Sequence, residues 1–269
     1  MTTVLSPRAA AIRRQIAYAA HKSKASHVGS ALSVVEILEA LYFRVANISK
    51  DNVNSPDRDR IILSKGHGSL GLYCTLAEKG IISRECLSKY LTDGGVLPCH
   101  IDMNACDGLE ASTGSLGHGV GIAEGFALAN RLKGIKARIF VIVGDGEFQE
   151  GSVFEALNSI GSLNLKEITV ILDNNKFQAS AATNEVVNVD NYEKIFEALN
   201  FNAIRVDGHD VDAIEIALKT QSDKPLAVIA DTIKGKDFSI FENTLASHYI
   251  KLDDEKYAKT LADLGGLKQ

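Results

Sequence analysis

Two oxygen-bearing side chains, those of Asp145 and Asn175, predict a magnesium site that serves a diphosphate group. Mg²⁺ favours oxygen ligands in near-octahedral geometry and takes only a few from protein, while phosphate oxygens and water supply the others. Asp145, within GDGEFQEG (144–151), offers a carboxylate oxygen, and Asn175, within DNNK (173–176), offers an amide oxygen. Either segment alone fits a tight turn or a polar loop equally well, but together they favour a single ion.

Two predicted strands bring these residues to the same edge of a sheet. Residues 138–143 and 168–172 are short, apolar and rich in β-branched side chains, which is typical of strands buried on both faces. Asp145 and Asn175 follow these strands closely, and ligands of open parallel sheets bind beyond the carboxyl ends of the strands. The glycines on either side of Asp145 permit a sharp turn and a close approach of the backbone to a ligand.

Helices alternate with apolar strands along the chain, which predicts an α/β fold with a mostly parallel sheet and helices on both faces. Ser6 and Pro7 open a first helix that runs to about Lys24, and Ser33 with Glu36 predicts a capping box for a helix over 34–44. Further helices are expected to end at Gly80 and to span 117–133, 151–160, 192–199 and 211–219, and strands to span 60–63, 138–143, 168–172, 203–206 and 226–230. Residues 91–113 lack periodicity, and loops of that length are usually functional.

Composition and charge exclude several classes of protein. With 269 residues, 45% hydrophobic content and a mean hydropathy of +0.01, the chain is expected to fold as a single α/β domain over residues 1–269. Its net charge is −5 and no basic cluster appears, which argues against nucleic acid or an anionic membrane as a partner. No apolar stretch reaches about 18 residues and no secretory signal opens the chain, so we expect a cytoplasmic protein. The four cysteines lack metal-binding or redox spacing and are expected to be reduced thiols.

The metal segments and five further motifs resemble, in order, those of the amino-terminal half of transketolases, the domain that binds the diphosphate of thiamine diphosphate (ThDP). The likeness covers residues 6–262. Its motifs are SHVGS (26–30), LSKGHG (63–68), LPCH (97–100), STGSLG (112–117) and TIKGK (232–236), with His248 downstream. Three family residues are replaced, by Ser26, Val28 and Ser115, and these changes affect loop stiffness more than chemistry.

The resemblance implies roles for individual residues. Asp145 and Asn175 would provide side-chain ligands to Mg²⁺, and Phe177 would provide its backbone carbonyl. Cofactor contacts are implied for His67, Gly114, Leu116, Gly144, Asp145, Gly146, Glu147 and Asn175, and substrate or proton-transfer roles for His27, His67, His100 and His248. The flanks of His248, LASHY in place of the family's GWHG, leave its role open. The remaining histidines, His21, His118 and His209, are expected to be solvated or structural.

The resemblance also implies a partner chain. In the family, a glutamate of a second, pyrimidine-binding domain activates ThDP, and the cofactor then performs the carbanion chemistry. Only 37 residues (233–269) follow Thr232, whereas a further α/β domain needs roughly 100. We therefore expect the activating glutamate on another polypeptide, in an α2β2 assembly. Glu150 and Glu155 resemble family glutamates at the dimer interface that communicate with it, although acidic residues in a first helical turn also simply favour the helix dipole.

These observations predict the amino-terminal subunit of a split transketolase-like enzyme. Such an enzyme transfers a two-carbon ketol unit from a ketose, expected to be a sugar phosphate, to an aldose acceptor. Two alternatives stay open: another ThDP enzyme, similar to 1-deoxyxylulose-phosphate synthase or to a dehydrogenase E1 subunit, and a non-catalytic homologue that has lost ThDP. The histidines of LSKGHG and LPCH favour transketolase over the first, and the intact Asp145 and Asn175 argue against the second.

Overall fold

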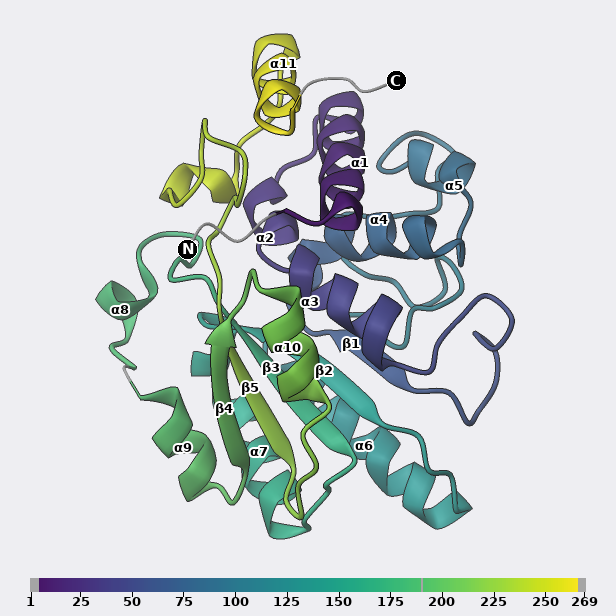
Figure 1. Ribbon diagram of the computed structural model, residues 1–269, viewed down its shortest axis with the longest axis vertical. Helices are drawn as coiled ribbons and strands as arrows, with labels where there is room; N and C mark the ends of the chain where they lie inside the picture. Colours follow the sequence, from purple (N-terminus) through teal and green to yellow (C-terminus); the bar gives the residue numbers. More distant parts are fainter. Residues whose placement is uncertain (1–4, 190, 266–269) are drawn as a thin grey trace.

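A five-stranded parallel sheet forms the centre of the computed structural model, which describes residues 5–189 and 191–265 (Figure 1). The strand order is β1-β2-β3-β5-β4, and each neighbouring pair is parallel. The strands are β1 (Arg60–Leu63), β2 (Ile139–Gly144), β3 (Ile168–Asn174), β4 (Asn202–Asp207) and β5 (Leu226–Asp231). Both β2 and β3 are buried along their whole length, as their apolar sequences require. The five predicted strands are present, and the predicted fold class is confirmed.

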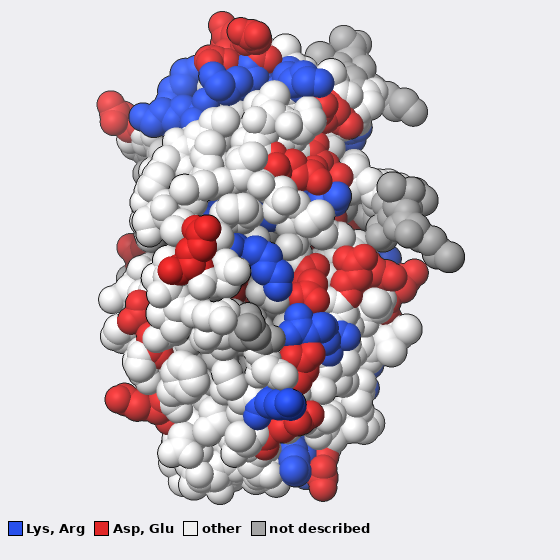
Figure 2. Space-filling view, turned by 90° about the vertical axis from the view of Figure 1, so that its left-hand side faces the viewer, with Lys and Arg blue, Asp and Glu red and all other residues white. Residues whose placement is uncertain are grey.

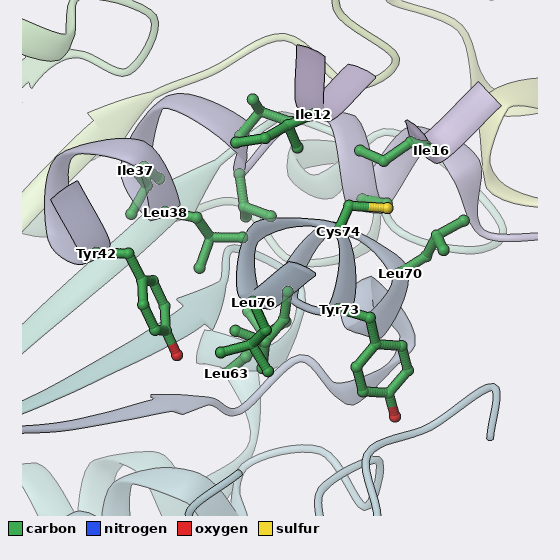
Figure 3. Packing of buried hydrophobic residues seen from close by; sticks show 14 of the residues in the cluster. Ile12, Ile16, Ile37, Leu38, Tyr42, Leu63, Leu70, Tyr73, Cys74 and Leu76 are labelled. Carbon is green, nitrogen blue, oxygen red and sulfur yellow. The ribbon is translucent and has the colours of Figure 1, made fainter. Parts of the chain in front are cut away.

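Helices cover both faces of the sheet (Figure 1). One layer contains α1 (Pro7–Ser23), α2 (Val28–Leu32), α3 (Val35–Ala40), the π-helix η1 (Leu41–Val45), α4 (Ser69–Lys79), α5 (Arg84–Ser88) and α10 (Val211–Leu218). The other contains α6 (His118–Lys133), α7 (Gly151–Ser162) and α9 (Tyr192–Ala198). Side chains alternate along β2, so that Phe140 packs in the first core and Val141 in the second. Figure 3 shows part of the first core, to which α1, α3 and α4 contribute Ile12, Leu38 and Leu76.

Several helix ends follow the local sequence signals. The Ser6 hydroxyl accepts a hydrogen bond from Ala9 N at 2.9 Å, and Pro7 is the first residue of α1. Helices α4 and α6 end at Gly80 and Gly134, whose φ angles of +78° and +68° are those of a left-handed helix cap. The predicted starts and stops are confirmed at these positions.

The helix predicted over 34–44 is present as α3 and the π-helix η1, which together span 35–45, but its predicted capping box is wrong because Val34 stands at the N-cap position. Ser33 caps no helix with its side chain but donates to Asp173 at 2.8 Å, and Glu36 accepts a hydrogen bond from Arg13 at 2.6 Å. A buried charge without partners costs more than an uncapped helix end, so these tertiary contacts replace the local motif.

Short helical turns at loop positions were not predicted, and three of them carry candidate site residues. The 3₁₀ turns η2 (Gly66–Gly68), η3 (Glu147–Gln149) and η4 (Leu245–His248) contain His67, Glu147 and His248. Two further helices, α8 (Thr183–Val186) and α11 (Asp254–Asp263), complete the described chain. Residues 89–117 contain neither helix nor strand, which confirms the long loop expected over 91–113. In the described residues, no helix is both long and apolar enough to span a membrane.

Charged groups of both signs are mixed on the face shown in Figure 2. Basic side chains gather at the top of this view, but acidic side chains lie directly beside them. This face therefore offers no extended basic surface of the kind that binds nucleic acid.

Candidate active site

The thirteen predicted site residues line a single cavity of about 300 Å³ at the carboxyl ends of β1, β2 and β3. A volume of this order is typical of small-molecule sites. The residues are His27, His67, His100, Gly114, Leu116, Gly144, Asp145, Gly146, Glu147, Glu150, Asn175, Phe177 and His248. They come from segments spread over more than two hundred positions, and the parallel strands bring them to one edge.

Asp145 is a buried carboxylate without an ion-pair partner among the residues that the structure describes. It is 1% exposed, and its oxygens accept hydrogen bonds from Gly146 N at 2.9 Å, Lys176 N at 2.7 Å and the Thr183 hydroxyl at 3.0 Å. Burial and the neighbouring carboxylate of Asp173 raise the pKa of Asp145 to about 6. A divalent cation at this position would supply the missing positive charge.

Asp173 fixes the orientation of the Asn175 amide. Asn175 Nδ2 donates to Asp173 Oδ2 at 3.0 Å, and a carboxylate can only accept. The amide oxygen therefore points elsewhere, and Phe177 N–H contacts it at 3.2 Å. Asp173 also accepts hydrogen bonds from Lys65 and Ser33. Burial raises the pKa of Asp173, but the Lys65 ammonium and the hydrogen bonds from Lys65, Thr232 and Ser33 together outweigh burial, and the net pKa is lowered.

The donor atoms at this edge fit a magnesium ion. The Asp145 carboxylate, the Asn175 amide oxygen and the Phe177 carbonyl are hard oxygen ligands of the kind that Mg²⁺ prefers. Within the described part of the chain, no group of three or more His, Cys, Asp or Glu could hold a metal alone, so phosphate and water would complete the coordination. The Phe177 carbonyl accepts a hydrogen bond from Lys234 Nζ at 2.9 Å and keeps its second lone pair.

The Glu147 carboxylate connects three segments around the cavity through hydrogen bonds. Its Oε1 accepts hydrogen bonds from the Ser64 hydroxyl at 2.5 Å and from Gly117 N at 2.9 Å, and its Oε2 accepts one from Gly144 N at 3.1 Å. Burial raises the pKa of Glu147, and these hydrogen bonds oppose the shift. The carboxylate thereby joins the ends of β1 and β2 to the start of α6.

Four of the predicted histidines form one cluster beside this acidic edge. The His27 ring lies 5.6 Å from the His67 ring, 5.8 Å from the His100 ring and 5.1 Å from the His248 ring, measured between centroids. The Tyr249 ring lies 5.5 Å from that of His27. His27 has a positive φ of 64°, and its N–H donates to the His248 carbonyl at 2.9 Å. The η4 turn thus holds His27 in a backbone conformation that is unfavourable by itself.

Three histidines of this cluster are uncharged near pH 7. Burial lowers the pKa of His27, of His67 and of His248, the last to about 3. The nearby ammonium groups of Lys65 and Lys234 add to the effect. A neutral imidazole carries one donor and one acceptor, which suits contacts with hydroxyl groups.

Two glycines allow loops to meet at the cavity. A Cβ at Gly66 would lie 2.5 Å from the carbonyl group of Thr113, which cannot yield because it belongs to the backbone. Gly114 has a φ of +140°, and a Cβ there would lie 2.9 Å from the His100 ring. Larger residues at either position would displace the 112–114 segment or the His100 ring.

Glu150 and Glu155 face outward from the start of α7. Glu150 is exposed at the rim of the cavity, and Glu155, also exposed, lines a separate hollow between α6 and α7. Neither carboxylate has a hydrogen bond or ion pair in the described part of the chain. Both side chains are therefore available to a second polypeptide.

Several residues that shape the site were absent from the sequence prediction. Lys65, Asp173 and Lys234 lie inside the quoted motifs LSKGHG, DNNK and TIKGK, which is the signal that could have identified them. Thr183, which donates to Asp145, lies outside the quoted motifs, whereas Tyr249, beside the histidines, is the last residue of the quoted segment LASHY. The predicted structural histidines His21, His118 and His209 do not line the cavity.

Comparison with known proteins agrees with the fold and the site. Residues 6–268 match the family described as transketolase, thiamine diphosphate binding domain. The chain is 40% identical over 242 residues to the 6-deoxy-6-sulfo-D-fructose transketolase subunit SqwG of Clostridium sp. strain MSTE9, which covers 88% of each chain. It is 38% identical over 248 residues to an apulose-4-phosphate transketolase subunit of Actinobacillus succinogenes, which covers 91% of this chain and 90% of the relative.

Solved transketolase structures share the architecture. The transketolase of Campylobacter jejuni matches with a TM-score of 0.89 and 29% identity, over 96% of this chain and 42% of that chain. The transketolase from Leishmania mexicana matches with a TM-score of 0.90 and 26% identity, over 99% of this chain and 42% of that chain. The chain thus spans about two fifths of these longer proteins.

The parallel sheet, with its acidic and histidine-lined cavity at the carboxyl edge, defines a domain that binds thiamine diphosphate. The chain belongs to the transketolase family, as its thiamine diphosphate-binding domain. Over most of its length it is homologous to proteins named as transketolase subunits. The predicted family and its class, the transferases, are confirmed.

Proposed function

We propose that this chain is the amino-terminal subunit of a split transketolase and transfers a two-carbon ketol unit from a ketose to an aldose together with a partner subunit. The observation that supports this most is the single cavity that the thirteen candidate residues line. In it, an acidic edge suited to a metal and a diphosphate lies beside a cluster of histidines suited to sugar hydroxyls. Ketol transfer needs both kinds of site within one cofactor's length.

The acidic edge would hold Mg²⁺ and the diphosphate of ThDP. Asp145, Asn175 and Phe177 would provide the metal ligands. The backbone at Gly114 and Leu116, and the glycines flanking Asp145, would contact the cofactor because a chain without bulky side chains lets it approach closely. ThDP supplies the electron sink for breaking and forming carbon–carbon bonds next to a carbonyl.

The histidines would bind the sugar and move its protons. His27, His67 and His100 lie together at the cavity and can donate to, or accept from, the hydroxyls of a ketose. A positioned acid or base of this kind typically contributes roughly 10²- to 10⁴-fold to a rate. Their shared position beside the acidic edge also supports transketolase chemistry over the alternative ThDP enzymes.

The anionic end of the substrate would be recognised by the partner subunit. The cavity's lysines, Lys65 and Lys234, already bind acceptors of this chain. The named substrates of the two relatives are a sulfo-sugar and a sugar phosphate, which supports an anionic ketose as donor. A cation for that group would therefore come from outside the described chain.

The partner would carry the pyrimidine-binding domain and the activating glutamate. Three relatives that match nearly their whole length are named as subunits, which supports an enzyme divided between two chains. The outward-facing Glu150 and Glu155 would lie at the interface of an α2β2 assembly, and we place that assembly in the cytoplasm.

Mixing experiments test this function. The purified 269-residue chain, supplied with ThDP and Mg²⁺, should show no ketol transfer in a coupled assay that uses a ketose phosphate donor. Addition of the cognate partner should restore turnover in proportion to the complex that size-exclusion chromatography detects. The isolated chain should also self-associate, because the apolar surface that would face the partner would then be exposed to water.

Two outcomes would contradict the proposal. Robust turnover by a preparation that mass spectrometry shows to contain only this chain would exclude a split enzyme. A stoichiometric complex that binds ThDP but transfers no ketol unit from any ketose tested would exclude transketolase activity and favour another ThDP reaction.

Glu150→Gln should weaken the activity of the assembled enzyme. Glu85→Gln, at an exposed position of α5, serves as its control.

A further inference from the structure

We infer that Lys234 is a positioning residue whose ammonium group holds the His248 ring with Nδ1 as acceptor and the hydrogen on Nε2, and ties that ring to the loop of Phe177. Only the catalytic consequence of this inference rests on the proposed function. The sequence around His248 departs from the transketolase pattern, so the role of this residue cannot be carried over from the family. Local contacts have to define it.

Lys234 reaches three acceptors from a buried position. The residue is 1% exposed, and its Nζ lies 2.9 Å from Phe177 O, 3.1 Å from Gln178 O and 2.9 Å from His248 Nδ1. A lysine ammonium has three hydrogens and no lone pair, so each of the three acceptors takes one hydrogen. His248 Nδ1 must therefore accept, and the neutral ring carries its hydrogen on Nε2.

The surroundings of His248 favour this tautomer. Burial and the Lys234 charge lower the pKa of His248 to about 3, which keeps the ring neutral. The rings of His27 and His67 lie 5.1 and 5.5 Å away, and no carboxylate binds His248 in the described residues. Its Nε2–H has no protein partner in the described part of the chain, and the ring lines the cavity. It presents a donor to an oxygen of a bound ligand.

The backbone beneath Lys234 is anchored on several sides. Each anchor joins the 232–236 segment to another element: Thr232 Oγ1 to Asp173, Ile233 N to His209 Nε2 at 2.8 Å, Gly235 N to Gly29 O at 3.1 Å, and Asn243 N to Lys234 O at 2.8 Å. Because the chain is fixed at both ends of the residue, the reach of its side chain is fixed as well.

A buried charge network supports the same segment from behind. Glu36 of α3 accepts hydrogen bonds from Arg13 of α1 at 2.6 and 3.0 Å and binds His209 Nδ1 at 2.9 Å. His209 in turn accepts the Ile233 N–H through Nε2. A substitution of Lys234 therefore changes the contacts of the side-chain tip, while the segment keeps its own supports.

The bridge joins the two halves of the site. Phe177 belongs to the acidic edge, as a candidate metal ligand, and His248 belongs to the histidine cluster. Loss of the ammonium would free the His248 ring to take either tautomer, whereas the β-bridge between Phe177 and Ala182 would keep residues 177–178 in place. The donor at Nε2 would then be present only part of the time.

The tautomer can be measured without any enzyme assay. Long-range ¹H–¹⁵N spectra of the ¹⁵N-labelled full chain distinguish the two neutral forms of histidine, and His248→Gln identifies the signals of His248. We expect the Nε2–H form in the wild type. Lys234→Met, which keeps the length but removes the donor, should give a mixture or the Nδ1–H form. Lys219→Met, at an exposed lysine of the α10 end paired with Glu215, should leave the spectrum of His248 unchanged.

A double-mutant cycle in the assembled enzyme tests whether Lys234 acts through His248. Lys234→Met should lower kcat/KM for the ketose roughly 10- to 100-fold, the scale observed when a group that orients a functional histidine is removed. ThDP affinity should change only a few-fold. The double variant should be no slower than His248→Gln alone, because the two residues work as one unit.

The possible results separate cleanly. An Nδ1–H tautomer in the wild type would overturn the inference, and so would losses that multiply in the double variant. If Lys234→Met fails to fold, the wild-type tautomer still decides. An assembled enzyme without ketol transfer would refute the proposed function but would leave the tautomer result intact.

Discussion

Asp145→Asn should separate cofactor binding from protein stability. The substitution keeps the shape of the side chain and removes one negative charge at a site that is 1% exposed. In the wild type, one carboxylate oxygen accepts a hydrogen bond from Gly146 N, and the other accepts from Lys176 N and Thr183 Oγ1. The asparagine oxygen can serve the second pair, which leaves its NH₂ group opposite the Gly146 N–H.

Two opposing contributions set the change in folding free energy. A pKa of about 6 in place of 3.8 means that burial destabilises the Asp145 anion by about 3 kcal/mol, and asparagine avoids this cost. The Gly146 N–H without an acceptor costs about 1 to 3 kcal/mol. The free energy of unfolding of the metal-free chain should therefore change by less than about 2 kcal/mol.

In Asp145→Asn, no favourable contribution offsets the loss of metal-binding free energy. In the wild type, a divalent cation relieves the roughly 3 kcal/mol of electrostatic cost at Asp145 in addition to gaining a ligand. A neutral amide offers neither the charge nor the relief. The loss should reach at least about 3 kcal/mol, which corresponds to a factor of about 100 or more in affinity.

Calorimetric titration of Mg²⁺ into the assembled enzyme at fixed ThDP measures the binding, and urea unfolding of the metal-free chain measures the stability. Asp51→Asn, at an exposed loop position, is the matched control. Asp145→Ala should abolish Mg²⁺-dependent binding as well. Near-normal cofactor affinity in either variant of Asp145 would refute its assignment as a metal ligand, and a large loss of stability with unchanged affinity would mark it as structural.

Other substitutions test the remaining parts of the site. His67→Ala or His100→Ala should lower kcat/KM by roughly 10²-fold or more with ThDP affinity within a few-fold, and His21→Ala should lower neither; parallel losses of rate and cofactor binding would instead indicate structural roles. Gly114→Ala should lower the free energy of unfolding by about 1 to 3 kcal/mol in thermal unfolding, because a φ of +140° strains any residue with a side chain. It should also lower kcat/KM, because the added methyl group would displace the His100 ring. Unchanged stability and unchanged kcat/KM would contradict this close packing. The Arg13 and His209 partners of Glu36 outweigh the effect of burial and lower the pKa of its carboxyl to about 2. The ionised carboxylate should therefore stabilise the fold by about 3 kcal/mol above pH 4.5, and this stabilisation should be lost as the pH falls through 2. Glu36→Gln should flatten this acid dependence in urea unfolding, and an unchanged pH dependence would refute the argument.

The sequence predicts the strands well because the residues of each strand themselves indicate that it is buried. Residues 138–143 and 168–172 are apolar at nearly every position, which only a strand covered on both faces requires, and the structure confirms both. Glycines at helix ends are equally local signals, since a left-handed cap favours glycine regardless of what surrounds it. The edge that gathers the candidate residues follows from these strands alone.

Contacts between distant segments explain what the sequence does not predict. Ser33 and Glu36 have the spacing of a capping box, yet their side chains bind Asp173 and Arg13, whose positions are set only by the folded chain. Likewise, short turns such as η4 form where the surrounding loops hold them. Nothing in the local pattern at 245–248 distinguishes such a turn from an extended loop.

Two aspartates at the carboxyl edge illustrate how the fold assigns different tasks to identical side chains. Asp145 and Asp173 lie at the ends of neighbouring strands, and both are fully enclosed. Asp173 has the Lys65 ammonium as counter-ion, and its pKa is lowered; Asp145 has no such partner in the described chain, and its pKa is raised. A carboxylate that already has a cation gains little from a metal, whereas one without a cation gains much. We therefore propose that a metal would bind at Asp145, while Asp173 orients Asn175. Lys65, the residue that makes the difference, lies 108 positions away from Asp173 in the chain, so the electrostatic reason for the two roles exists only in the folded chain.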